Sequence, residues 1–291
     1  LPTSYFLLPT LITLAAFGLR VYGLGADSLW YDEAYSALVA RSDGVTAARM
    51  ASADLNPLLH PLLLRAGVAA LGSSEFALRF VSLVFGVALI PLMWALAVRL
   101  FDRATARLAA ALVCCAPLFV WYSREARMYS QMATLGLAAA YALVRAQAEG
   151  KRRWWLVFAV CALGAFNSHY LALYWIAALG VFWITSSFIR PAVPSATAQW
   201  AGWAAFGLVA LGILAIAPRL LDLSQSSHIY WPGQLDVPTA LLVAARAMVG
   251  WRTAAPQAAD ALAVLCGVMS LAALARAFTL PGIRRGVWLA S

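Results

Sequence analysis

Charged residues are scarce in this chain: they make up 11% of its 291 residues, while hydrophobic residues make up 64%. A soluble globular domain carries about 25% charged residues, so an ordinary soluble protein is excluded. The mean hydropathy of +0.81 instead predicts a chain that is embedded in a membrane. Because lipid takes the place of a large central core, we expect a single membrane-embedded domain over residues 1–291.

Several familiar motifs are absent as well. The sequence has no Walker motif and no other glycine-rich phosphate loop, so no nucleotide-binding fold is expected. The isoelectric point is near 9.8, but the basic residues are scattered over short segments, which argues against nucleic-acid binding. The cysteines form no C-x-x-C pair and no zinc-binding spacing, and all lie in apolar runs as expected of small core residues (Cys114, Cys115, Cys161 and Cys266).

Long apolar runs, in contrast, are abundant. A helix needs roughly 20 apolar residues to cross a bilayer, and backbone inside lipid must satisfy its own hydrogen bonds, which forces helices. We therefore predict an all-α, polytopic membrane protein. The polar residues at 167–169 divide one long run into two short helices joined by a tight turn. About eight transmembrane helices are predicted, at residues 5–24, 80–98, 107–122, 130–146, 154–168, 171–189, 200–217 and 258–277.

Basic residues collect on one side of this predicted bundle. The connections on that side hold eleven of the 21 basic and two of the 12 acidic residues, so the whole net charge of +9 lies there. The positive-inside rule makes that side cytoplasmic. The extracytoplasmic side then holds all three histidines and two long segments, 25–79 and 218–257. In the first segment we expect amphipathic interfacial helices, the first of them beginning at Leu29 with Asp27 or Ser28 as its cap.

Two adjacent carboxylates, Asp32 and Glu33, stand among aromatic residues where the first apolar run leaves the membrane. A carboxylate that is partly desolvated at the lipid boundary can act as a general base. Neighbours on a helix point about 100° apart, so only one of the pair can face a common site. The alternative interpretation is a solvated interfacial helix with acidic residues near its positive N-terminus.

A second stretch, Trp121 to Ser130, holds two arginines and a glutamate and links two predicted spans on the same face. Guanidinium groups match the oxygen atoms of phosphate, so Arg127 and its neighbours can bind an anionic headgroup. Interfacial anchoring by arginine and tyrosine explains the same pattern. Arg79 follows Glu75 by one helical turn, and a simple ion pair between them is enough to explain both residues.

The histidines on this face have both structural and functional interpretations. His60 lies between two prolines, and His169 lies with Tyr170 at the break between two spans. Each can be a hydrogen-bonded turn residue or can bind a ligand. Together with the acidic residues they leave open a divalent metal site, although no local ligand spacing supports one.

Five segments, taken in order, resemble bacterial membrane glycosyltransferases of the protein O-mannosyltransferase and aminoarabinose transferase type, family 39 and its relatives, which have the GT-C membrane fold. The resemblance covers roughly residues 5–190. The chain departs from the family by having Leu58 and Leu59 after Pro57 and by fewer predicted spans, so we expect a piece of a longer enzyme. The five segments are LWYDEA at 29–34, NPLLHP at 56–61, SEFALRFVS at 74–82, SREARMYS at 123–130 and SHY at 168–170.

The resemblance implies an inverting glycosyltransferase, such as a mannosyltransferase, of the bacterial plasma (inner) membrane. Its active site would face the outside or the periplasm. It would take a sugar from a polyprenyl phosphate and pass it to a lipid, glycan or protein acceptor. Asp32, with Glu33 beside it, would be the catalytic base. The residues implied to bind the donor phosphate and sugar are Arg127, His60, His169, Glu125, Tyr129, Tyr170 and Arg79.

Two other functions remain open at this point. A membrane transporter or lipid flippase needs a polar path through the bilayer, and the predicted spans contain almost no ionisable residues. A non-catalytic subunit of a membrane assembly would need no conserved chemistry at all. The observation that separates these possibilities is whether Asp32, Glu125, Arg127 and His169 line one cavity near the outer interface.

Overall fold

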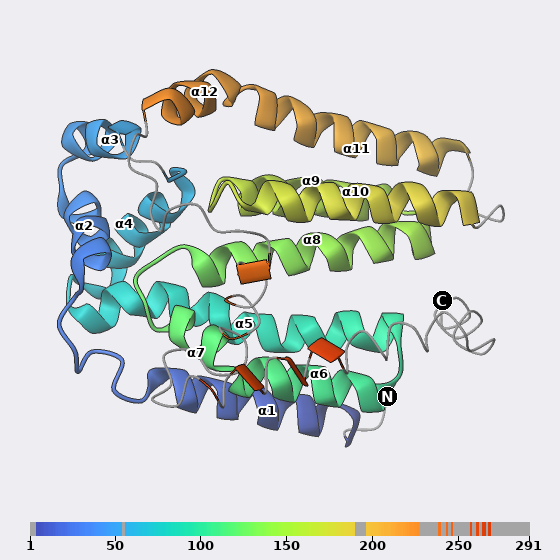
Figure 1. Ribbon diagram of the computed structural model, residues 1–291, viewed down its shortest axis with the longest axis horizontal. Coiled ribbons are helices and arrows are strands. Elements are labelled where there is room, and N and C mark those ends of the chain that lie inside the picture. Colours follow the sequence, from blue (N-terminus) through green and yellow to red (C-terminus); the bar gives the residue numbers. More distant parts are fainter. Residues whose placement is uncertain are drawn as a thin grey trace.

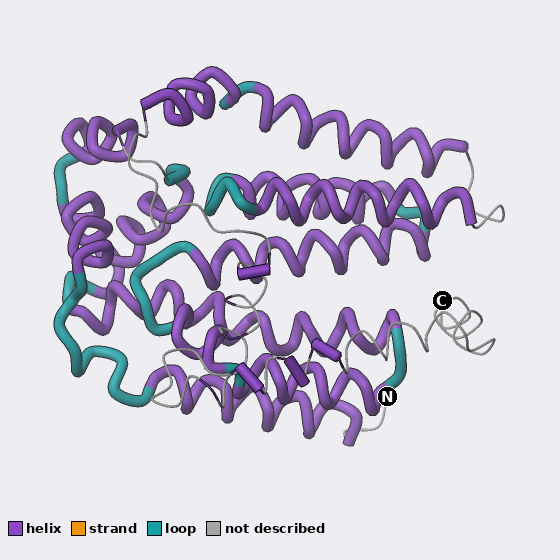
Figure 2. The backbone as a smooth tube through the Cα atoms, in the orientation of Figure 1, coloured by secondary structure: helices purple, strands orange, loops and turns teal. Residues whose placement is uncertain are grey.

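The computed structural model describes residues 4–53, 56–189 and 196–226, together with scattered positions between 238 and 268. The regular elements in these ranges are all helices, which confirms the predicted all-α class (Figure 2). They are α1 (Ser4–Val21), α2 (Tyr31–Arg41), α3 (Gly44–Ala53), α4 (Leu59–Leu71), α5 (Glu75–Leu100), α6 (Arg103–Cys115), α7 (Pro117–Ser123), α8 (Tyr129–Glu149), α9 (Arg152–Phe166), α10 (Ala172–Ile189), α11 (Ala196–Leu214) and α12 (Ala217–Ser226).

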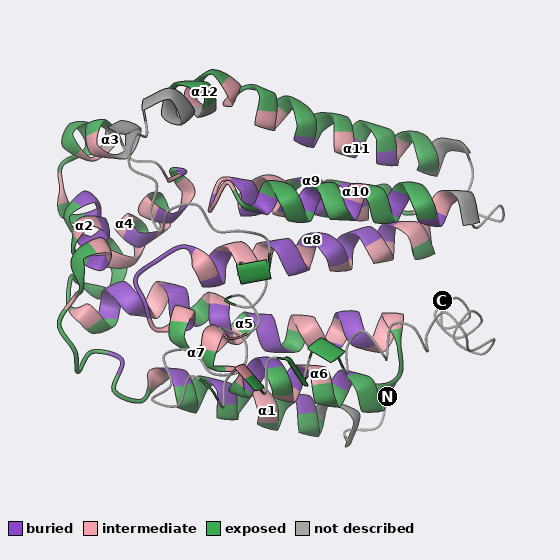
Figure 3. Cartoon of the chain, viewed as in Figure 1, coloured by how far each residue is buried: buried purple, intermediate pink, exposed green. Residues whose placement is uncertain are grey.

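The long apolar helices run side by side as a bundle, whereas α2, α3 and α4 gather at one of its ends (Figure 1). Buried side chains are concentrated on α5 and α8, and much of α10 and α11 is exposed (Figure 3). The exposed side chains of α10 and α11 are mostly hydrophobic. In a membrane protein such surfaces contact lipid, so they need no protein partner.

The predicted spans agree with helices as far as residue 217. The first seven runs each fall on described helices, and the turn predicted at 167–169 is confirmed between α9 and α10. By length and composition one described helix, α5, can cross a membrane, and α6 with α7 makes a second if the bent pair is one span. The eighth run, 258–277, lies mostly outside the described residues, so the count of eight and the single domain stay predictions.

The run at 107–122 was predicted as one helix, and this is wrong, because α6 and α7 meet there at an angle of 55°. Pro117 is the first residue of α7 and has no backbone N–H, so α6 cannot continue through it. The carbonyl groups of Val113 and Cys114 accept hydrogen bonds from Arg20 of α1 at 3.1 and 3.0 Å. The same buried guanidinium donates to Ser123 Oγ of α7 at 3.2 Å, so one side chain joins three helices at the break.

The segment after α1 begins its first helix later than predicted. The N-cap of α2 is Trp30, so the predicted start at Leu29 and the cap by Asp27 or Ser28 are both wrong. The carbonyl groups of Asp27 and Ser28 instead accept hydrogen bonds from Arg79 of α5, at 2.9 and 3.1 Å. These bonds hold the stretch before α2 outside the helix.

Helices α5 and α7 approach each other closely at Gly86. A Cβ atom at this position would lie 1.9 Å from Ser123 Oγ, which is closer than real atoms come. Glycine is therefore required for α7 to pack against α5. Because α7 ends at Ser123, this contact also fixes the start of the loop that follows, residues 124–128.

We expect Gly86→Ala to destabilise the protein by about 1–3 kcal/mol, because the added methyl group overlaps Ser123 and forces the helices apart. The measurement is thermal unfolding of the purified protein in detergent micelles. Gly207→Ala in α11 is the matched control, since nothing lies within 4 Å of a Cβ at that position. A melting temperature for Gly86→Ala at or above that of the control would contradict the close approach.

Candidate active site

The loop 124–128 is held by side chains from three different helices. The N–H of Ala126 donates to Glu33 Oε1 of α2 at 2.8 Å, and its carbonyl oxygen lies 3.2 Å from His60 Nε2 of α4. One residue later, the carbonyl oxygen of Arg127 accepts a hydrogen bond from Ser82 Oγ of α5 at 2.8 Å. The backbone of the loop is therefore held at Ala126 and again at Arg127. These contacts fix the position from which the Arg127 side chain extends.

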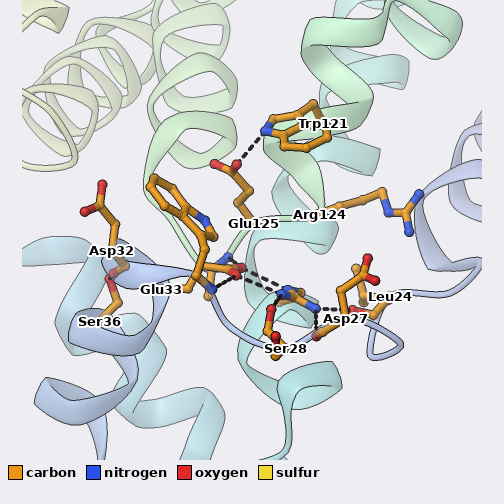
Figure 4. Close-up of polar contacts among 12 residues, drawn as sticks. Leu24, Asp27, Ser28, Asp32, Glu33, Ser36, Trp121, Arg124 and Glu125 are labelled. Carbon is orange, nitrogen blue, oxygen red and sulfur yellow. Dashed lines mark hydrogen bonds and ion pairs between the residues drawn. The ribbon is translucent and has the colours of Figure 1, made fainter. Parts of the chain in front are cut away.

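Glu33, the second carboxylate of the acidic pair, is buried in an ion pair with Arg79. The guanidinium is bidentate, with Nε at 2.9 Å from Oε1 and Nη2 at 2.8 Å from Oε2. Its remaining donors reach the carbonyl groups of Leu24, Asp27 and Ser28 (Figure 4). The pairing of Arg79 with Glu75 suggested by their spacing in the sequence is wrong, because the guanidinium of Arg79 pairs with the carboxylate of Glu33 on α2 instead.

Asp32, the first carboxylate, points away from Glu33 (Figure 4). Its side chain is 36% exposed, and its Oδ2 lies 3.6 Å from Arg127 Nη2, which is an ion pair but too long for a hydrogen bond. Arg127 Nη1 lies at the edge of hydrogen-bonding distance, 3.3 Å from Ser36 Oγ and 3.4 Å from the Asp32 carbonyl oxygen. Its buried Nε has no acceptor among the described residues. This guanidinium therefore keeps donors that an anion can use.

Tyr129 and His169 extend the cluster around Arg127. The guanidinium carbon lies 6.0 Å from the centre of the Tyr129 ring, and the Tyr129 and His169 rings are 5.8 Å apart. Burial, and then the charge of Arg127, lower the pKa of His169, which favours its neutral form. Because its Nδ1 accepts the Leu171 N–H at 3.1 Å, the neutral ring carries its proton on Nε2.

His60 and Tyr170 make other contacts. His60 is buried, and besides Ala126 it contacts Gln131 Oε1 through Nδ1 at 3.1 Å. The neutral ring has a single N–H, so it donates to one of these two oxygens at a time. Tyr170 packs on Phe166, with the ring centres 5.4 Å apart, at the edge of the hydrophobic core.

A cavity of about 790 Å³ opens beside loop 124–128, and residues of α1 and α7 are among those that line it. Glu125, Glu33 and Arg79 line it, whereas Asp32, Arg127 and His169 do not. Three of the predicted site residues thus line the cavity, whereas Asp32, Tyr129 and His169 cluster with Arg127. The other residues that line the cavity are Leu19, Gly23, Leu24, Asp27, Ser28, Trp30, Cys115, Pro117, Val120, Trp121 and Arg124.

Glu125 lies against Trp121 in this cavity, and the indole Nε1–H donates to its Oε1 (Figure 4). Cys115, predicted to be a core residue, is exposed and lines the cavity, because the bend after α6 turns it out of the packing. Of the other cysteines, Cys114 is buried and Cys161 is half-buried, and Cys266 lies outside the described residues.

Several polar residues of this region were missed in the sequence. Ser82 and Gln131 are fully buried, and each holds part of the site: Ser82 binds the loop, and Gln131 joins His60 to Ser168 Oγ at 2.8 Å. Their signal was a polar residue inside a predicted membrane span. For a metal, the described residues contain no group of three or more histidine, cysteine, aspartate or glutamate side chains placed to hold one.

The helical arrangement is the GT-C fold of membrane glycosyltransferases. It is similar to the S. cerevisiae protein O-mannosyltransferase Pmt1-Pmt2 complex bound to the sugar donor, with a TM-score of 0.61 and 15% sequence identity. The similarity covers 86% of this chain and 37% of that chain. This chain therefore spans little more than a third of the length of the protein that it resembles.

The chain belongs to the dolichyl-phosphate-mannose-protein mannosyltransferase family, whose model matches residues 55–220. This confirms the resemblance found in the sequence motifs. No curated protein matches the chain. The matched range contains Arg79, Arg127 and His169 but begins after the acidic pair, and the hydrogen bonds of Glu33 are among the contacts that join α2 to this matched segment.

The buried histidine of the site predicts a pH dependence of stability. Burial lowers the pKa of His60 from 6.5 to about 4, so the folded protein keeps this ring neutral where the unfolded chain binds a proton. The stabilisation is complete above pH 6.5 and is lost as the pH falls toward 4, by at most about 3 kcal/mol.

We therefore expect the melting temperature in detergent to fall between pH 7 and pH 4.5, and His60→Gln to remove part of that slope. The variant keeps a hydrogen-bonding side chain but cannot titrate. Carboxylates that titrate in the same range contribute equally to both proteins, so the difference between the two slopes isolates His60. Parallel slopes would contradict the buried, neutral ring.

Proposed function

We propose that this chain is part of a glycosyltransferase that moves a sugar from a polyprenyl phosphate to an acceptor hydroxyl, with Asp32 as the general base. The observation that carries the proposal is the partly exposed carboxylate of Asp32 beside Arg127, whose Nε has no acceptor among the described residues. A base and an anion-binding group are the two elements that such a transfer needs.

In the proposed reaction Asp32 accepts the proton of the acceptor hydroxyl as its oxygen attacks the anomeric carbon. The bond from that carbon to the phosphate oxygen breaks, and the phosphate leaves with the bonding electrons. Attack from the side opposite the leaving group inverts the anomeric carbon. Arg127 is fixed in advance at the developing charge of the phosphate, and the Nε2–H of His169 is a second donor on the same side.

The buried residues have a different proposed role. Both carboxylate oxygens of Glu33 accept hydrogen bonds. The guanidinium of Arg79 donates to Glu33 and to three backbone carbonyl groups. His60 is likewise bonded to the loop through Ala126. We therefore propose Glu33, Arg79 and His60 as positioning residues, in place of the direct catalytic and donor-binding roles expected of them.

Glu125 and the cavity that it lines are proposed to receive the lipid end of the donor. Glu125 and Arg127 are two residues apart, so their Cα atoms lie within about 7.6 Å of each other. A phosphate at Arg127 thus has its isoprenoid chain within reach of the apolar cavity walls on α1 and α7. The Tyr129 ring lies beside Arg127, and we propose that it contacts the sugar. Tyr170 packs on the hydrophobic core and is not assigned to the donor site.

The proposed location is the bacterial inner membrane, with the site on the extracytoplasmic face. Among the described residues, the helix ends and connections at the opposite end of the bundle carry an excess of basic side chains, which under the positive-inside rule supports a cytoplasmic location for that end. They hold seven basic residues against two acidic ones: Arg99, Arg103, Arg107, Arg145, Lys151, Arg152 and Arg153 against Asp102 and Glu149. The acceptor, whether lipid, glycan or protein, approaches from the aqueous side, where Asp32 is exposed.

To test this function, membranes that contain the protein are incubated with polyprenyl-phosphate mannose carrying a radioactive sugar, and loss of label from the lipid is followed. We expect Asp32→Asn to lower turnover at least about 100-fold, because the amide cannot accept the proton, while the donor remains bound. Arg127→Gln should weaken donor binding as well as turnover, since it removes the anion-binding charge.

Asp102→Asn is the control for the loss of a carboxylate. Asp102 caps the start of α6 by accepting the Thr105 N–H, and that end of α6 is remote from loop 124–128 (Figure 1). The variant should keep wild-type turnover. Unchanged turnover in Asp32→Asn would remove Asp32 as the base, and the absence of any product with every lipid-linked sugar would remove the proposed activity.

A further inference from the structure

A cleft of about 500 Å³ lies between α9 and α11 at the end of the bundle away from the candidate active site. Its walls are apolar: Leu156 and Ala159 on α9 face Ala204 and Leu208 on α11. Both leucines are exposed at the bundle surface. From Arg152 to Ala159 the cleft follows about two turns of helix, roughly 10 Å, so its occupant is a narrow apolar chain over that length.

The mouth of the cleft is basic. Arg152 is the first residue of α9 and lines the cleft, and it has no ion-pair partner among the described residues. Its neighbours Lys151 and Arg153 both pair with Glu149, at 3.3 and 3.8 Å. Arg152 is thus the basic residue left for an external anion. The positive end of the α9 dipole adds to its attraction.

Trp155 supplies the third feature. Its side chain is 4% exposed and lines the cleft, and its buried Nε1 has no hydrogen-bond acceptor among the described residues. The indole edge next to that nitrogen faces α11, since a Cβ at Gly202 would lie 3.1 Å from Cζ2 of this ring. A buried donor without a partner is unfavourable by about 1–3 kcal/mol, so an acceptor at this seam stabilises the site.

We propose that this cleft binds an anionic phospholipid, with one acyl chain between α9 and α11 and the phosphate at Arg152. An ester oxygen of the lipid accepts the Trp155 Nε1–H. Arg152 and Trp155 are three residues apart, so they lie on one face of α9 with an axial offset of about 4.5 Å. That offset matches a phosphate at the membrane surface and an ester just below it.

Charge selects the kind of lipid. The charge of Arg152 at the mouth of the cleft repels the cationic group of a zwitterionic headgroup, whereas phosphatidylglycerol brings an uncharged glycerol group next to its phosphate. The site is distinct from the proposed transferase site. The lipid-binding proposal can therefore be tested independently of the proposed transferase activity.

The test is native mass spectrometry of the purified, delipidated protein, titrated with phosphatidylglycerol, phosphatidylcholine or inorganic phosphate. We expect one phosphatidylglycerol to bind at least about tenfold more tightly than phosphatidylcholine. Arg152→Gln and Trp155→Phe should each weaken this binding about tenfold. Arg153→Gln removes the same charge one residue away, outside the cleft, and should leave binding unchanged.

A second pair of variants tests the cleft itself. Ala204→Leu fills the cleft and should abolish the tight adduct, whereas Ala210→Leu makes the same change at an exposed position of α11 that does not line it. Equal binding of the two lipids, or tight binding that survives Ala204→Leu, overturns the proposal. So does competition by inorganic phosphate alone, which indicates a simple anion site. A dimer that excludes lipid overturns it too, because another protein surface then covers the cleft.

Discussion

The loop that carries Arg127 depends on one buried ion pair, between Glu33 and Arg79. Such pairs contribute little net stability, because desolvation offsets most of their attraction, whereas removing one partner is typically unfavourable by about 3–5 kcal/mol. Their value here is geometric. The carboxylate of Glu33 also accepts the Ala126 N–H, and Arg79 also binds the backbone before α2. A single polar contact thus brings together α2, α5 and the loop after α7, which are far apart in the sequence.

The loop exists at that position because the helix before it is broken. Pro117 ends α6, and the carbonyl groups left at the break would be unsatisfied in a lipid environment. Arg20 satisfies two of them, and Gly86 lets the short helix α7 lie against α5. The presence of Arg20 inside the apolar helix α1 is thereby explained, because its guanidinium donates to backbone carbonyl groups. It needs no bound ligand as a partner. The same bend turns one wall of the cavity toward the candidate site.

The sequence was informative about periodicity and composition, and less informative about partners. The all-α class, the turn at 167–169 and the divergence of Asp32 from Glu33 all follow from local rules of helix geometry. The partner of Arg79 does not, because Glu75 is nearer in sequence but Glu33 is nearer in space. The bend at Pro117 had a visible signal, yet the apolar run continued through it. Which of several acids meets an arginine is decided by packing across the bundle, and spacing in one segment carries no information about that.

The two arginine–carboxylate pairs at this end of the bundle differ in a way that assigns their roles. Arg79 is saturated: each of its donors meets a carboxylate or carbonyl oxygen within 3.1 Å, and binding another anion would break bonds that hold the loop. Arg127 is 3.6 Å from its carboxylate and has a buried Nε without an acceptor among the described residues, so the phosphate proposed to bind there would replace weak contacts with strong ones. Differential binding of this kind is what a transferase requires, because only interactions that strengthen as charge develops lower the barrier. The saturated pair therefore fits the scaffold, and the unsaturated pair fits the chemistry.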